Sequence, residues 1–134
     1  MCDSDWSSDV CSSDLLDSLK QMLNQLSNTY QKDILIAETA YPFTLDWNDW
    51  TTNIVGLEEQ LILPDYPASP EGQKAFLQKI RKIVATTPRG AGFCYWGAER
   101  IACKGPEATD GSGWENQALF SFSNHALPAL EVFD

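Results

Sequence analysis

A short apolar run that ends in a carboxylate places the strongest constraint on the fold. Ile34–Ala37 are all apolar, and Glu38 follows them directly. A continuous apolar run of this length is typical of a strand buried on both faces, as in parallel sheets. Burying a charge at its end costs free energy unless the charge has a partner or a chemical role. Because catalytic groups of parallel α/β folds lie where strands end, Glu38 is the leading catalytic candidate. A strand-end glutamate that faces solvent or pairs with a lysine has the same sequence pattern.

Helical patterns alternate with the apolar strands. Residues 16–30 carry apolar side chains at three- and four-residue spacing, which predicts an amphipathic helix. A second helix begins at Ser69, with Pro70 in its first position, and continues to about residue 85. Gly92–Trp96 form a second strand, rich in aromatic residues. Helices alternating with buried strands predict an α/β fold.

The apolar pattern predicts only two buried strands in the chain. A two-stranded parallel sheet cannot cover itself or bury a stable core. The sequence therefore indicates a fragment of a larger domain.

Residues 1–15 show neither the helix period nor the strand period, and they lack the basic start and apolar region of a secretory signal. The stretch 5–15 resembles the in-frame translation of a common sequencing-library adapter. We therefore expect 1–15 to be a non-native segment and 16–134 to be the natural part, whose true N-terminus was cut away. The alternative is a natural acidic, serine-rich linker.

The charge and cysteine content exclude several classes of partner. The formal net charge is −10, whereas binding to nucleic acid or anionic membranes needs clustered Lys and Arg. No apolar stretch approaches the roughly 20 residues of a membrane span. There is no Cys-x-x-Cys pair, and His125 is the only histidine, so a zinc or other histidine-based metal site is not indicated.

Several aromatic residues fall in or beside the two long loops that follow the strands: Trp47, Trp50, Tyr66, Trp96 and Trp114. Flat aromatic faces complement the C–H faces of pyranose rings. A strand-end glutamate with tryptophans in neighbouring loops is the arrangement that a glycosidase cleft needs. For any single tryptophan, core packing is the alternative.

Four segments in order resemble the C-terminal part of glycoside hydrolase family 53, the endo-β-1,4-galactanases that act on arabinogalactan. They are 34–42 (ILIAETAYP), 66–76 (YPASPEGQKAF), 92–96 (GFCYW) and 114–120 (WENQALF). The resemblance covers essentially all of residues 16–134. It implies the C-terminal portion of a (β/α)8 TIM barrel, with 16–30 as the sixth helix and the two strands as the seventh and eighth.

The resemblance also implies roles for individual residues. Glu38 falls on the catalytic nucleophile of a retaining glycosidase, and Trp96 on an aromatic residue that lines the cleft. We predict that Tyr41, Trp47, Trp50 and Trp114 also bind substrate. Many members continue after the Tyr-Trp pair with Glu-Pro-Ala-Trp, whereas this chain has residues 97–100 as Gly-Ala-Glu-Arg. We therefore do not expect the sugar contacts that those residues would make, while the nucleophile is unaffected.

In this family the acid/base carboxyl lies on the fourth strand, upstream of this chain. Five acids in or beside the two loops are the available substitutes, and none of them occupies its position: Asp46, Asp49, Glu99, Glu107 and Glu115. We therefore expect the 134-residue chain to be inactive alone. Two alternatives remain open, namely another retaining barrel-clan glycosidase of β-glucanase type and a non-catalytic carbohydrate-binding module. The amphipathic helices argue against the module, which is usually all-β.

The expected partner is β-1,4-galactan or arabinogalactan, and the resemblance implies that the full-length protein is monomeric and secreted or periplasmic. No cofactor is required. Calcium is an option, because some bacterial members carry it near these loops and the last loop holds oxygen ligands of the kind that it takes. These are Glu107, Asp110, Ser112, Glu115 and Asn116. The spacing matches no calcium motif, and a solvated acidic loop is the favoured interpretation.

Overall fold

The computed structural model describes residues 12–134, so most of the adapter-like segment 1–15 lies outside the described residues. Four main elements follow one another: α1 (Ser12–Tyr30), β1 (Ile34–Thr39), α2 (Pro70–Thr86) and β2 (Gly90–Tyr95). Short 3-10 helices lie in the connecting and closing segments: η1 (Glu58–Gln60), η2 (Glu115–Gln117) and η3 (Pro128–Phe133). In this part of the chain no helix is long and apolar enough to cross a membrane.

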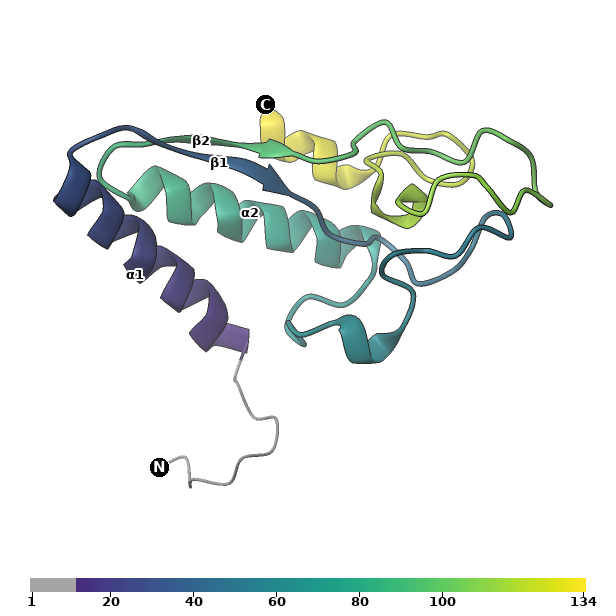
Figure 1. Ribbon diagram of the computed structural model, residues 1–134, viewed down its shortest axis with the longest axis horizontal. Helices are drawn as coiled ribbons and strands as arrows, with labels where there is room; N and C mark the ends of the chain where they lie inside the picture. Colours follow the sequence, from purple (N-terminus) through teal and green to yellow (C-terminus); the bar gives the residue numbers. More distant parts are fainter. Residues whose placement is uncertain (1–11) are drawn as a thin grey trace, which may run out of the picture.

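The two strands pair in parallel, and α2 connects them and packs beneath the sheet (Figure 1). The unit is a β-α-β crossover, as the alternating pattern predicts. Ile36 pairs with Phe93 and Thr39 pairs with Tyr95. Two residues of β1, Ala37 and Glu38, therefore lie opposite Cys94 alone. Such a bulge bends the strand and redirects the side chains at that point.

Helix α2 begins where the sequence predicts. The Ser69 hydroxyl accepts a hydrogen bond from the backbone N–H of Gly72 at 2.9 Å, and Pro70 opens the helix. A side chain at position 72 would place its Cβ within 1.9 Å of the carbonyl oxygen of Pro67. Glycine thus permits the preceding loop to pack directly onto the first turn, which fixes where the loop after β1 ends.

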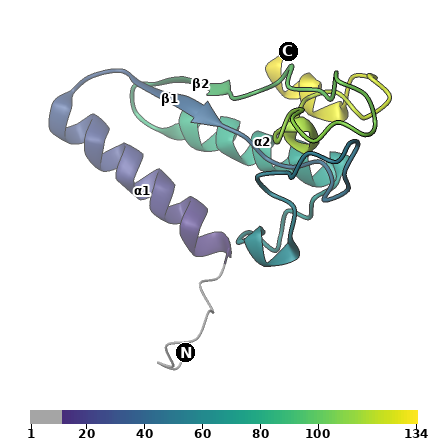
Figure 2. The ribbon, with the colours of Figure 1, turned by 45° about the vertical axis from the view of Figure 1, so that its right-hand side comes forward.

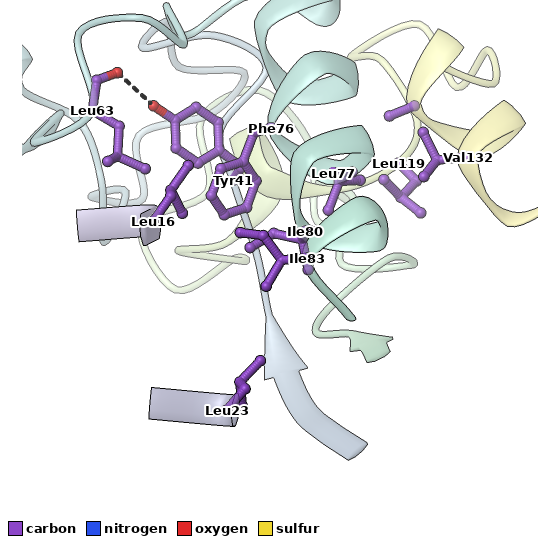
Figure 3. Close-up of a cluster of buried hydrophobic side chains, with 11 residues drawn as sticks. Leu16, Leu23, Tyr41, Leu63, Phe76, Leu77, Ile80, Ile83, Leu119 and Val132 are labelled. Carbon is purple, nitrogen blue, oxygen red and sulfur yellow. Dashed lines mark hydrogen bonds between the residues drawn. The ribbon is translucent and has the colours of Figure 1, made fainter. Parts of the chain in front are cut away.

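The core lies between α2, the sheet and the C-terminal segment (Figure 3). Its centre is formed by side chains that are at most 3% exposed: Leu77, Ile80, Ile83, Leu119 and Val132. Complete burial of one such side chain contributes about 1.5–3 kcal/mol. Through these contacts the sheet and the loops after both strands pack against α2.

One face of the sheet is uncovered, which contradicts the prediction that residues 34–37 are buried on both faces. Leu35 is 56% exposed, and Ala37 and Cys94 are also exposed. The described residues supply a covering layer only on the side of α2. Similarly, the apolar stripe of α1 is buried at Leu16 and Leu23 but exposed at its end, where Tyr30 is 65% exposed.

Candidate active site at the carboxyl ends of the strands

The loops after β1 and β2 lie side by side at the carboxyl end of the sheet (Figures 1 and 2). Backbone hydrogen bonds join them at three places. Phe43 N–H donates to the carbonyl of Asn116 at 2.9 Å, Trp50 N–H donates to that of Ala108 at 2.9 Å, and Ile54 N–H donates to that of Gly113 at 2.8 Å. The two loops therefore form one body beside the strand ends.

Glu38 lies on the bulge of β1, and its side chain is exposed. Within residues 12–134 it forms no ion pair, so pairing with a lysine does not explain its position. The next residue, Thr39, accepts a hydrogen bond from the backbone N–H of Trp96 at 2.8 Å. The structure thus presents Glu38 and Trp96 from adjacent strands at the same end of the sheet.

The tryptophans are at the surface of the two loops. Trp47 is 51% exposed, Trp50 is 63% exposed and Trp96 is 38% exposed, so core packing does not account for them. Trp114 is half-buried and meets Trp96 edge to face, with ring centroids 6.3 Å apart. The guanidinium carbon of Arg100 lies 5.5 Å from the centre of the Trp96 ring. The segment that departs from the family pattern thus places a cation on this indole.

Tyr41 does not share this surface. Its side chain is 7% exposed, its ring stacks on Phe76 with centroids 4.4 Å apart, and its hydroxyl donates to the carbonyl of Tyr66 at 2.5 Å (Figure 3 shows the ring in the core). Burial, followed by the nearby Tyr66, raises the pKa of Tyr41 to about 12. The ring fills the space above α2 where the chain leaves β1, so it offers no face to a sugar, contrary to the predicted binding role.

A buried polar network joins the strand ends to α2, and sequence reasoning missed it. Gln73 is fully buried, and its amide donates to the carbonyls of Tyr41 at 2.9 Å and Ala118 at 3.1 Å. The Tyr95 hydroxyl lies 3.0 Å from the same Tyr41 carbonyl and 2.7 Å from that of Gln117. Burial raises the pKa of Tyr95 to about 12. The available signal was a glutamine on the apolar face of α2.

Two acids of the loops are buried. Glu115 is 1% exposed, and its Oε1 accepts from the backbone N–H of Asn48 at 2.7 Å. Asp49 is 3% exposed, and its Oδ1 accepts from the N–H of Thr51 at 2.7 Å. Burial raises the pKa of Glu115; the hydrogen bond from Asn48 opposes this shift, and the charge of Asp49 adds to it. These two carboxyls anchor backbone in the loop after β1.

The predicted calcium candidates do not form one site. Asp110 pairs with Lys104 at 2.8 Å, and the Ser112 hydroxyl donates to the carbonyl of Arg100 at 2.9 Å. Among the described residues, no group of three or more His, Cys, Asp or Glu is arranged to hold a metal ion. Some buried side-chain oxygens lack a hydrogen-bond partner, and oxygen atoms of this kind are the ligands that calcium prefers. They belong only in part to the residues that the sequence suggests for calcium. On these two loops they belong to Asp49, Asn53, Glu115 and Asn116.

None of the predicted site residues lines the open groove of about 660 Å³ between Phe43, Pro70 and Phe122. In a complete barrel the cleft is built from the loops after all eight strands. This chain supplies two of these loops, which is consistent with an open, exposed setting for Glu38.

Parallel strands joined by a helix, with chemistry-bearing residues at the carboxyl ends of the strands, are typical of α/β enzymes, including the α/β barrels. The family model described as glycosyl hydrolase family 53 matches residues 6–133. The chain is 36% identical to the arabinogalactan endo-β-1,4-galactanase of Cellvibrio japonicus over 121 residues, covering 88% of this chain and 31% of that protein. It is 31% identical to the endo-β-1,4-galactanase of Bacillus subtilis over 151 residues, covering 88% and 34%.

The solved GH53 catalytic domain of Ignisphaera aggregans superposes with a TM-score of 0.80 at 38% identity, covering 88% of this chain and 34% of that one. The chain therefore belongs to glycosyl hydrolase family 53 and folds as the C-terminal portion of its barrel. The predicted family and the predicted barrel fragment are both confirmed. The chain spans about a third of the length of the curated relatives that it matches.

Proposed function

We propose that this chain is the nucleophile-bearing part of a retaining endo-β-1,4-galactanase. The observation that carries the proposal is the position of Glu38, an exposed carboxylate on a bulge at the end of β1, one residue before the backbone contact with Trp96. The activity named for the Cellvibrio and Bacillus relatives supports galactan as the substrate.

A retaining glycosidase uses two carboxyl groups about 5–5.5 Å apart. Glu38 would attack the anomeric carbon, while the second carboxyl protonates the departing glycosidic oxygen. That second group then takes a proton from water, which displaces Glu38 and releases the sugar. The exposed indoles of Trp96 and Trp47 would pack against sugar rings.

The second carboxyl is not provided by the buried acids of this chain. Glu115 and Asp49 hold backbone N–H groups inside the loops, so neither can approach a substrate without opening them. We therefore propose that the acid/base belongs to a part of the barrel outside this chain. The purified chain should then show no turnover of β-1,4-galactan, and turnover that Glu38→Gln abolishes would contradict this.

The nucleophile can be tested by grafting residues 16–134 onto the first two thirds of the Cellvibrio enzyme. Glu38→Gln should remove nearly all activity, because the covalent step has no other nucleophile. Glu99→Gln, which changes an exposed glutamate of the loop after β2, is the matched control and should retain activity. A 2-fluorogalactoside inactivator should label Glu38, and labelling elsewhere would refute the assignment.

The same graft separates the remaining alternatives. Preference for β-glucan over galactan would indicate a β-glucanase-type enzyme with the same nucleophile. The binding-module alternative predicts an all-β sandwich, which the α/β fold does not match.

A further inference from the structure

The loop that carries Trp47 and Trp50 has no helix or strand between residues 44 and 55. Both indoles are more than half exposed, so their own packing cannot fix them. The position of the loop therefore depends on the contacts that residues of the loop after β2 make with its backbone.

Glu115 holds the middle of this loop. Its Oε1 accepts the backbone N–H of Asn48, which lies between the two tryptophans in sequence, at 2.7 Å. Because Glu115 is 1% exposed, water cannot readily replace this hydrogen bond.

Asn116 holds both ends of the same loop. Its side-chain amide donates to the carbonyl of Thr44 at 2.8 Å and to that of Val55 at 2.6 Å. Its own carbonyl accepts from the N–H of Phe43 at 2.9 Å. The side chain is fully buried, so its two donors have no alternative partner in solvent.

We propose that Glu115 and Asn116 are positioning residues that hold loop 44–55 in the shape that presents Trp47 and Trp50 to a galactan chain. The inference rests on the proposed function for its ligand. Neither side chain contacts the substrate. They act by satisfying buried backbone groups, and each unsatisfied group makes local opening easier.

Amide hydrogen exchange of the 134-residue chain tests the positioning role directly. Glu115→Ala and Asn116→Ala should each speed exchange in residues 44–55 at least about tenfold, which corresponds to about 1.4 kcal/mol. Glu115→Gln should stay near wild type, because its amide oxygen still accepts from Asn48. Glu107→Ala is the control, because Glu107 is an exposed acid of the loop after β2, which also carries Glu115. Unchanged exchange in α2 and β2 shows that the variants are folded.

Binding of β-1,4-galactotetraose, followed by tryptophan fluorescence, tests the ligand. The two alanine variants should bind at least about tenfold more weakly than Glu115→Gln and the control. Faster exchange with unchanged affinity, or unchanged exchange in both alanine variants, would overturn the inference. If the wild-type chain does not bind the oligosaccharide, the proposed sugar platform fails, while the exchange result still decides whether the two residues hold the loop.

Discussion

Replacing Tyr95 with phenylalanine should destabilise the chain more than the loss of one oxygen atom suggests. The hydroxyl accepts from the N–H of Tyr41 at 3.1 Å and from the Gln73 amide at 3.2 Å, and it lies 2.7 Å from the carbonyl of Gln117. Gln73 retains other acceptors, but the Tyr41 N–H and the Gln117 carbonyl lose a buried partner. Leaving one such group unsatisfied costs about 1–3 kcal/mol. With two such groups, we expect the free energy of unfolding to fall by about 2–6 kcal/mol.

Urea denaturation followed by circular dichroism measures this loss, provided that the dependence on denaturant is unchanged. Tyr30→Phe is the matched control, because the Tyr30 side chain is 65% exposed. The control should stay within about 0.5 kcal/mol of wild type. If Tyr95→Phe also stays within this range, the Tyr95 hydroxyl does not join β1, α2 and the loop after β2.

Two further predictions concern Ser69 and Glu115. Ser69→Ala removes the cap of α2 and should lower the free energy of unfolding, measured by thermal denaturation, by about 1 kcal/mol. Ser69→Asp should preserve stability. Equal melting temperatures for the wild type and both variants would contradict the capping role. Burial raises the pKa of Glu115 in the folded state, so the folded chain binds the proton more tightly. Stability should fall as pH rises from the ordinary glutamate pKa through this raised pKa. Glu115→Gln should flatten that part of a urea-midpoint profile against pH, and matching profiles would refute the assignment.

The sequence predicts the fold where its signals are local. Ser69 and Pro70 start α2 through contacts within one turn, and the apolar run 34–37 forms the expected parallel strand. The prediction of burial on both faces fails at Leu35 for a physical reason. An apolar pattern shows which faces are suited to burial, whereas burial itself requires a second layer, which residues 12–134 do not provide.

The candidate site could be predicted only in part. Glu38 and the exposed tryptophans follow from strand ends and loop composition. The bulge at Ala37 and Glu38 depends on the register with β2, which has no local signature. The roles of Glu115 and Asn116 arise from contacts with residues about 60–70 positions away. The sequence predicts a binding role for Tyr41, which is buried, because an aromatic residue after a strand end has the same pattern whether it faces solvent or the core.

The setting of each carboxylate, more than its place in the sequence, distinguishes chemistry from support. A nucleophile needs an oxygen that can reach the anomeric carbon, and Glu38 is exposed and unpaired within the described chain. Glu115 lies in an equivalent strand-end loop but is buried, and it accepts a hydrogen bond from the backbone N–H of Asn48. Ionisation of Glu115 is disfavoured by its burial, and its movement would release the tryptophan loop. This contrast supports the proposal that Glu38 is the reacting group, and it excludes Glu115 from the role of the second carboxyl that a retaining mechanism would require.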